Sequence, residues 1–157
     1  MALTLHSENF SPGGEIPVVF TCQGEDRSPH IAWRGAPEAT RSFALIVDDP
    51  DAPDPRAPRM TWVHWVLFNI PADIVELPEG AAGDLPSGVG EGINDWKRTG
   101  YGGPCPPVGR HRYVFKLYAL DTALSGLDRP TKEELLEAVQ GHILERAQLI
   151  GTYEKQG

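Results

Sequence analysis

The sequence predicts a mainly β fold, and two observations carry that prediction. Short apolar runs follow one another along the 157-residue chain, and 17 glycines and 15 prolines stand largely between them. Glycine and proline interrupt strands and build turns, so this placement is typical of short strands joined by turns. A chain of this length can bury a core without metal or disulfide support. We therefore expect one domain over residues 1–157.

The expected strands follow in chain order: residues 3–5, 18–21, 30–33, 43–47, 62–70 and 112–120. Residues 43–47 are continuously apolar, which favours a strand buried on both faces. Strict alternation along 62–70 would place His64 on the same face as Trp62, Val66, Phe68 and Ile70. The same alternation predicts that His111 and Tyr113 point the same way.

Between residues 71 and 101 the chain is rich in glycine, proline and acidic residues and shows little periodicity. We expect a long connection there, without strands.

One helix is predicted near the end of the chain. Residues 131–134 read as a capping box, with Thr131 at the N-cap and Glu134 three positions later. Apolar residues at helical spacing follow: Leu135, Leu136, Val139, Ile143, Ala147 and Ile150. Gly151 is expected to end this helix, with at most a short last strand beyond it.

The charge balance excludes some partners. The chain has 14 Lys and Arg against 22 Asp and Glu, a formal net charge of -8. A chain with this negative charge repels the phosphates of nucleic acid and of anionic membranes, so any anion has to be bound at a local site. We therefore expect no nucleic-acid partner. No stretch approaches the about 20 apolar residues of a membrane span, and the first residues lack the pattern of a secretion signal. These features predict a cytoplasmic protein without a membrane span.

The two cysteines, Cys22 and Cys105, could pair in principle. Because a domain of this size in a reducing compartment has little need of a disulfide, we expect free thiols. Cys105 stands between two prolines, with no cation or helix N-terminus nearby in sequence to activate it. A catalytic role for this thiol is therefore not expected.

Acidic and histidine residues gather at the ends of predicted strands. Asp49 and Asp51 directly follow residues 43–47, and neighbouring prolines restrict the backbone that carries them. His64 interrupts the apolar pattern of the next strand, which we expect to lie beside the first. Desolvating such groups is costly unless binding or chemistry repays it. The alternative for His64 is a core histidine held by one backbone carbonyl.

Similar residues elsewhere are expected to be structural or solvated. Asp48 and Asp54 fit a turn with exposed acids. His6, His30 and His142 have no acidic company in the sequence pattern.

A loop rich in glycine and proline, residues 100–107, comes shortly before His111 and Tyr113. Glycine lets the backbone approach a ligand closely, and consecutive N–H groups in such a loop can form an anion-binding nest. The prolines keep the loop stiff, and the expected N–H donors are those of Gly102, Gly103, Cys105, Val108 and Gly109. Glycine and proline loops are common, so the placement beside His111 carries this prediction.

These residues resemble the phosphatidylethanolamine-binding protein family, also called Raf kinase inhibitor protein-like, and above all its short bacterial YbhB/YbcL branch. The likeness extends from residue 11 to residue 153. Its most specific parts are the Asp-Pro-Asp-Ala-Pro turn at residues 49–53 and the segment from Gly103 through Pro106-Pro107 to the His-Arg-Tyr of residues 111–113.

The resemblance implies an antiparallel β-sandwich-like fold with a large central sheet, a smaller sheet and one C-terminal helix. It also implies a pocket for phosphate-type anions and phospholipid head groups, a cis bond between Ala52 and Pro53, and a possible homodimer. Carried over by motif position, the ligand-binding residues would be Asp49, Asp51, His64, Gly103, Pro104, Pro107, His111 and Tyr113.

The leading functional prediction is non-catalytic binding of a phosphate or phosphorylated head group, with no cofactor. Protonated His64 and His111 would bind the anion, so binding should tighten below about pH 6.5. One alternative is a hydrolase or metal-dependent enzyme that uses Asp49 or Asp51 together with the two histidines. Another is a regulator of a protein partner such as a kinase. The absence of an identifiable activated nucleophile favours the binding function.

Overall fold

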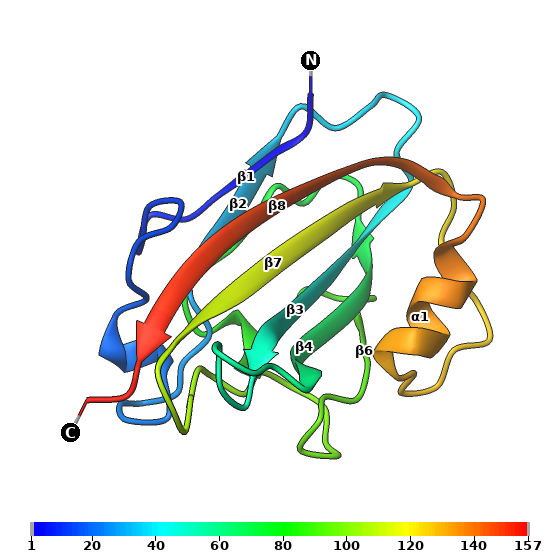
Figure 1. Ribbon diagram of the computed structural model, residues 1–157. Helices are drawn as coiled ribbons and strands as arrows, with labels where there is room; N and C mark the ends of the chain where they lie inside the picture. Colours follow the sequence, from blue (N-terminus) through cyan, green and yellow to red (C-terminus); the bar gives the residue numbers. More distant parts are fainter. Residues whose placement is uncertain (1, 157) are drawn as a thin grey trace.

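The computed structural model describes residues 2–156 and is mainly β, as predicted: two antiparallel sheets and, within these residues, one α-helix (Figure 1). The large sheet has the strand order β6-β4-β3-β7-β8, formed by β6 (Gly90–Glu91), β4 (Met60–Pro71), β3 (Ser42–Ala52), β7 (Arg110–Leu120) and β8 (Ile143–Glu154). The smaller sheet has the order β1-β2-β5, formed by β1 (Thr4–His6), β2 (Ile31–Arg34) and β5 (Glu76–Leu77).

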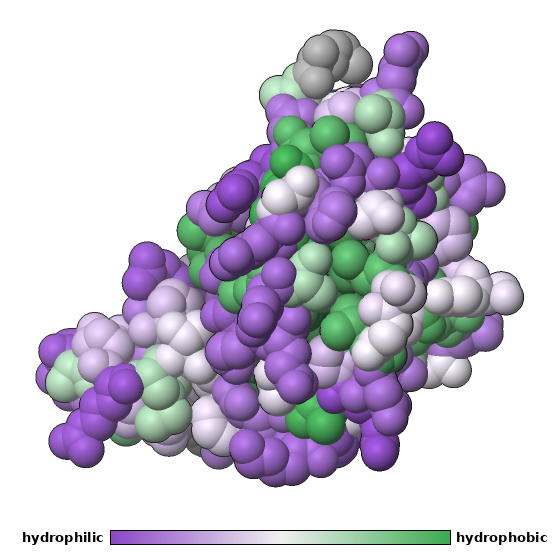
Figure 2. Space-filling model, turned by 90° about the vertical axis from the view of Figure 1, so that its right-hand side faces the viewer, coloured by the Kyte–Doolittle hydropathy of each residue, from purple (hydrophilic) through white to green (hydrophobic). Residues whose placement is uncertain are grey.

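The central strand β3 is buried on both faces, as its continuous apolar run predicts. Phe43 and Leu45 belong to the main core together with Trp33 of the smaller sheet. Ala44 and Ile46 point to a second apolar cluster, which includes Leu135 and Val139 of the helix α1 (Lys132–Val139) and so covers the other face. On the side that carries α1, the surface is mostly hydrophilic, and apolar residues appear between polar ones in small patches (Figure 2).

The alternation expected along β4 is wrong, because two register shifts interrupt it. One lies between the pairs Val47–Trp65 and Asp48–Val63, beside His64, and another lies between Phe43–Ile70 and Leu45–Leu67. Each shift changes which face the following residues occupy. Val66 and Phe68 therefore join the α1 cluster, whereas Ile70 joins the main core.

The C-terminal helix is shorter than predicted. The capping box is present: Thr131 accepts a hydrogen bond from the backbone N–H of Glu134, and Glu134 accepts one from the N–H of Thr131. The helix ends at Val139, and Gly141 adopts a left-handed conformation with φ 82° in the turn that follows. Ile143–Glu154 is then a strand, paired with β7 along its length. Long-range pairing overrides the local apolar spacing here.

Two smaller expectations also need correction. Residues 18–21 do not form a strand, because Val18–Phe20 is a short 3-10 helix, η1. The segment 71–101 is mostly a connection, but it contains the two-residue strands β5 and β6 and a second 3-10 turn, η2 (Ala81–Gly83).

The bond between Ala52 and Pro53 is cis, as the resemblance implies. Among residues 2–156, no helix has the length and apolar character needed to cross a bilayer.

Candidate functional site

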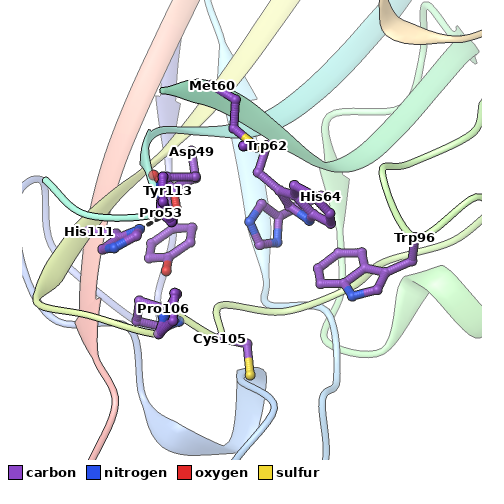
Figure 3. Close-up of a pocket in the computed structure, with 12 residues that line it drawn as sticks. Asp49, Pro53, Met60, Trp62, His64, Trp96, Cys105, Pro106, His111 and Tyr113 are labelled. Atoms are coloured by element: carbon purple, nitrogen blue, oxygen red, sulfur yellow. Dashed lines mark hydrogen bonds and ion pairs between the residues drawn. The ribbon is translucent and has the colours of Figure 1, made fainter. Parts of the chain in front are cut away.

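A cavity of about 360 Å³ lies at the end of the large sheet where β3, β4 and β7 meet the loops (Figure 3). Strand β3 contributes Asp49, strand β4 contributes His64, and strand β7 contributes His111 and Tyr113. The full lining is Asp49, Ala52, Pro53, Met60, Trp62, His64, Trp96, Cys105, Pro106, Pro107, His111 and Tyr113. The tertiary structure thus brings together Asp49, His64, Pro107, His111 and Tyr113, five of the eight predicted site residues.

His111 and Asp49 form a buried pair at the cavity. Nδ1 of His111 lies 2.6 Å from Oδ2 of Asp49, and both side chains are almost fully buried. Nε2 of His111 donates to the carbonyl oxygen of Val108 at 2.8 Å. Both ring nitrogens are therefore occupied, so this imidazole positions Asp49 and the loop rather than offering a free donor to a ligand.

Both oxygens of the Asp49 carboxyl group have hydrogen-bond partners. Oδ1 accepts a hydrogen bond of 2.7 Å from the N–H of Asp51, and Oδ2 contacts His111. Burial raises the pKa of Asp49, and the hydrogen bond from His111 opposes part of that rise. Because one proton lies between the carboxyl group and the imidazole, the pair is held in a fixed orientation whichever partner carries it.

His64 presents a different environment. Nδ1 donates to the carbonyl oxygen of Gly102 at 2.7 Å, and Nε2 has no hydrogen-bond partner among residues 2–156. Burial lowers the pKa of His64 to about 4, and the bond to Gly102 opposes only part of this effect. The ring is therefore neutral at neutral pH, and Nε2 carries a lone pair that can accept a hydrogen bond.

Tyr113 supplies a second polar atom without a partner. Its hydroxyl is buried and has no hydrogen-bond partner among residues 2–156, and the residue is only 1% exposed. Its ring lies 5.2 Å from that of His64 in an edge-to-face arrangement and 6.4 Å from that of His111 in a stacked one. Burial raises the pKa of Tyr113 above its ordinary value, so the hydroxyl stays protonated and can donate. An unpaired buried hydroxyl costs stability unless a ligand or water satisfies it.

Two tryptophans form an aromatic wall beside His64. The rings of Trp62 and Trp96 are 5.7 Å apart, and Trp96 lies 5.1 Å from the ring of His64. Figure 3 shows Trp96 and Trp62 on one side of His64, with Tyr113 on the other. Neither tryptophan is among the site residues expected from the sequence. Trp96, a lone aromatic residue in a polar loop, is a signal that could have been used.

Three predicted site residues do not line the cavity. Asp51 forms a bidentate ion pair with Arg112 and also accepts the N–H of that residue at 2.9 Å. These contacts, led by the guanidinium hydrogen bonds, lower the pKa of Asp51. Gly103 donates its N–H to Asp26 at 2.8 Å, and Pro104 accepts the N–H of Cys22 at 3.1 Å.

Two of the five backbone donors expected in the loop are used within the protein. Gly102 donates its N–H to the carbonyl of His64, and the N–H of Gly103 is used by Asp26. These donors hold the loop against β4 and the turn after η1 instead of facing a ligand.

Asp48 also differs from expectation: it is fully buried, and Oδ2 contacts the ammonium groups of Lys116 and Lys132 at 3.0 and 2.7 Å.

The cysteines are not free, contrary to expectation. Cys22 and Cys105 form a disulfide, with a Cα–Cα distance of 5.4 Å. The fold places the turn after η1 beside the pocket loop, although 83 positions separate the two residues in sequence. Sequence separation hides this spatial proximity, which the fold alone creates. The disulfide also removes Cys105 as a candidate nucleophile in this state.

Other histidines have structural partners. His30 accepts the N–H of Glu8 at Nδ1 and contacts Glu76 through Nε2 at 2.9 Å, and His142 contacts Asp121 at 2.8 Å. Within the described part of the chain, no group of three or more His, Cys, Asp or Glu side chains is arranged to hold a metal ion.

The comparisons with known proteins agree with this fold. The family model described as phosphatidylethanolamine-binding protein matches residues 6–154. The chain belongs to this family. The UPF0098 protein of Methanothermobacter thermautotrophicus is 48% identical over 155 residues, covering 98% of this chain and 99% of the relative. The UPF0098 protein of Aquifex aeolicus is 45% identical, covering 98% and 89%.

Two solved structures extend the comparison. A putative phosphatidylethanolamine-binding protein homologue from Chlamydia trachomatis has a TM-score of 0.90 and 42% identity, covering 99% of both chains. YbcL of Escherichia coli, described as a member of the mammalian PEBP family, has a TM-score of 0.89 and 32% identity, covering 99% of this chain and 100% of that one. The chain is thus a YbcL-like member of the phosphatidylethanolamine-binding protein family, and its relatives occur in archaea and bacteria.

Proposed function

We propose that this protein binds, without chemical turnover, a small phosphorylated molecule or lipid head group in the cavity that His64 and Tyr113 line. The observation that carries the proposal is the pair of unpartnered polar atoms at this cavity: Nε2 of His64 and the buried hydroxyl of Tyr113. A ligand that hydrogen-bonds both atoms removes the cost of leaving the hydroxyl unsatisfied.

The geometry supports a coupled proton and anion uptake. Neutral His64 has only an acceptor at Nε2, so it binds either a protonated phosphate oxygen or, after taking up a proton, a phosphate anion. An anion in hydrogen-bond contact favours the imidazolium and raises the pKa of His64 from about 4. The hydroxyl of Tyr113 donates to the same ligand.

The rest of the lining favours a zwitterionic or amphipathic head group. Trp62 and Trp96 offer aromatic faces, which attract an ammonium group as well as apolar carbon. The buried Asp49–His111 pair adds a polar floor with fixed orientation. Binding is also a better match than catalysis because Cys105 is oxidised and both nitrogens of His111 are occupied.

Calorimetric titration with inorganic phosphate, phosphoethanolamine and ethanolamine tests this proposal. We expect phosphoethanolamine to bind most tightly and ethanolamine alone to bind least. His64→Ala and Trp62→Ala should each weaken phosphoethanolamine binding by about tenfold or more, equivalent to the loss of one charge-assisted contact or one aromatic contact. Equal affinity in wild type and His64→Ala, or no binding of any phosphate compound, contradicts the proposal. Steady release of free phosphate from phosphoethanolamine would replace it with an enzymatic function.

A further inference from the structure

The disulfide lies at the boundary between the cavity and the solvent. Cys105 is half-buried and lines the cavity, whereas Cys22 is exposed in the turn that follows η1. A reductant can therefore approach the bond from the side of Cys22 without entering the pocket. The covalent bond connects a surface turn directly to the wall of the binding site. Figure 3 shows Cys105 at the edge of that wall.

The wall segment 105–107 has few other attachments. Within residues 2–156, no hydrogen bond joins Cys105, Pro106 or Pro107 to the rest of the chain. The nearest anchors flank the segment: Gly103 and Pro104 on one side, and Val108, which accepts from His111, on the other. Pro106 is buried, so packing helps to hold residues 105–107 in place. The disulfide is the covalent constraint that fixes the position of this segment.

We propose that Cys22–Cys105 is a redox switch for the pocket: the disulfide holds the ligand-binding wall in place, and reduction by a dithiol releases it and weakens binding. This inference rests on the proposed binding function. Disulfides that a cellular dithiol reductant can reach are more often regulatory than structural.

The chemistry is ordinary thiol–disulfide exchange. A thiolate of the dithiol attacks the sulfur of Cys22, which is an exposed residue, the bond to Cys105 breaks, and the sulfur of Cys105 leaves as a thiolate and takes a proton. The second thiol of the reductant then attacks the mixed disulfide and releases Cys22. The protein gains two electrons and two protons, and the reductant becomes a disulfide.

Reduction weakens binding because it lets residues 105–107 become less ordered. In the oxidised protein, the wall already stands where the ligand needs it, so binding carries no cost for arranging this segment. After reduction, residues 105–107 sample further positions, and the binding-competent fraction falls. The apparent dissociation constant rises by the inverse of that fraction. The anchors at Gly103 and His111 remain, so the loss is partial.

Titration of phosphoethanolamine into oxidised and dithiothreitol-reduced protein, with the thiols counted in each sample, tests the switch. We expect reduction to weaken binding by about fivefold and reoxidation to restore it. Cys22→Ser provides the matched control, because it breaks the tie from outside the cavity and leaves Cys105 in the wall. This variant should match the reduced wild type and should not respond to the reductant.

Amide hydrogen exchange supplies an independent readout. The N–H of Cys22, which donates to the carbonyl oxygen of Pro104 beside the disulfide, should exchange faster after reduction, while those of the β3–β7 pair should not change. Equal affinity in both redox states, with reduction verified, overturns the switch and leaves the binding function intact. Unchanged exchange at the Cys22 amide also overturns it. If the oxidised protein binds no phosphate compound, the proposed function fails, and the switch fails with it.

Discussion

The rings of His64 and Tyr113 meet edge to face at 5.2 Å, and each carries a polar atom without a hydrogen-bond partner among the described residues. Neighbouring polar groups usually satisfy one another or contact the backbone. Here His64 uses only Nδ1, on Gly102, and the hydroxyl of Tyr113 stays unpaired. This pair therefore gives the most direct tests of the site.

The pH dependence of phosphate binding should follow His64. The pKa of this residue in the empty pocket is about 4, and a bound anion raises it. Affinity should therefore rise as pH falls from neutrality towards about 4, by at most tenfold per pH unit, and level off below that. The interval lies lower than the unperturbed pKa of about 6.5 suggested. Calorimetry from pH 7.5 to 4.5 measures this effect. A flat profile in wild type, or an equal slope in His64→Gln, contradicts the assignment.

The stability of the empty protein should also depend on His64. Its folded-state pKa of about 4 lies below the unfolded value. Between about pH 6.5 and 4 the unfolded chain binds more protons, so this group contributes stability at neutral pH that is lost as pH falls, by about 1.4 kcal/mol per unit. Urea unfolding at a series of pH values should show a smaller decline in His64→Gln than in wild type. Parallel declines would contradict the lowered pKa.

Tyr113→Phe separates function from stability. Removal of a buried, unpaired hydroxyl should leave the free energy of unfolding unchanged or raise it by about 1 kcal/mol. The same change should weaken phosphoethanolamine binding by about fivefold or more, because a donor to the ligand is lost. Thermal unfolding and calorimetry on one sample give both values. A destabilised variant with unchanged affinity would show that the hydroxyl has a structural role only.

Asp49 and Asp51 should behave differently although they are two residues apart. Asp51 pairs with Arg112, whose side chain is 56% exposed, and it does not line the cavity. Asp51→Asn should therefore cost about 1 kcal/mol of stability and leave affinity within about twofold. Asp49→Ala removes the partner of buried His111 and should weaken binding markedly. Loss of binding in Asp51→Asn with Asp49→Ala unaffected would reverse this assignment.

Reduction of Cys22–Cys105 should lower thermal stability. The bond joins residues 83 positions apart, and closing a loop of that length contributes about 4 kcal/mol in the chain-entropy model. Scanning calorimetry with and without reductant should show a lower melting temperature, and the double variant Cys22→Ser, Cys105→Ser should match the reduced protein. A melting temperature that does not depend on the reductant, with free thiols verified, would contradict a disulfide in the folded protein.

Much of the architecture follows from local patterns. The continuous apolar run 43–47 identified a strand buried on both faces, and the capping box at Thr131 located the start of the helix. The motifs around Asp49, His64 and His111 identified the family and the place of the cavity, and alternation along β7 placed His111 and Tyr113 together. These features are local because they depend on strand period, turn chemistry and short motifs.

Other features depend on contacts between distant residues, which a single sequence does not reveal. Register shifts in β4 redistributed its side chains, and pairing with β7 made residues 143–154 a strand instead of a helix. Burial decided that His64 is neutral, the Arg112 contact removed Asp51 from the cavity lining, and the fold brought Cys22 to Cys105. The sequence alone determined which kinds of residue meet at the site. Tertiary packing decided their protonation, partners and free atoms, because desolvation and hydrogen bonding depend on three-dimensional neighbours.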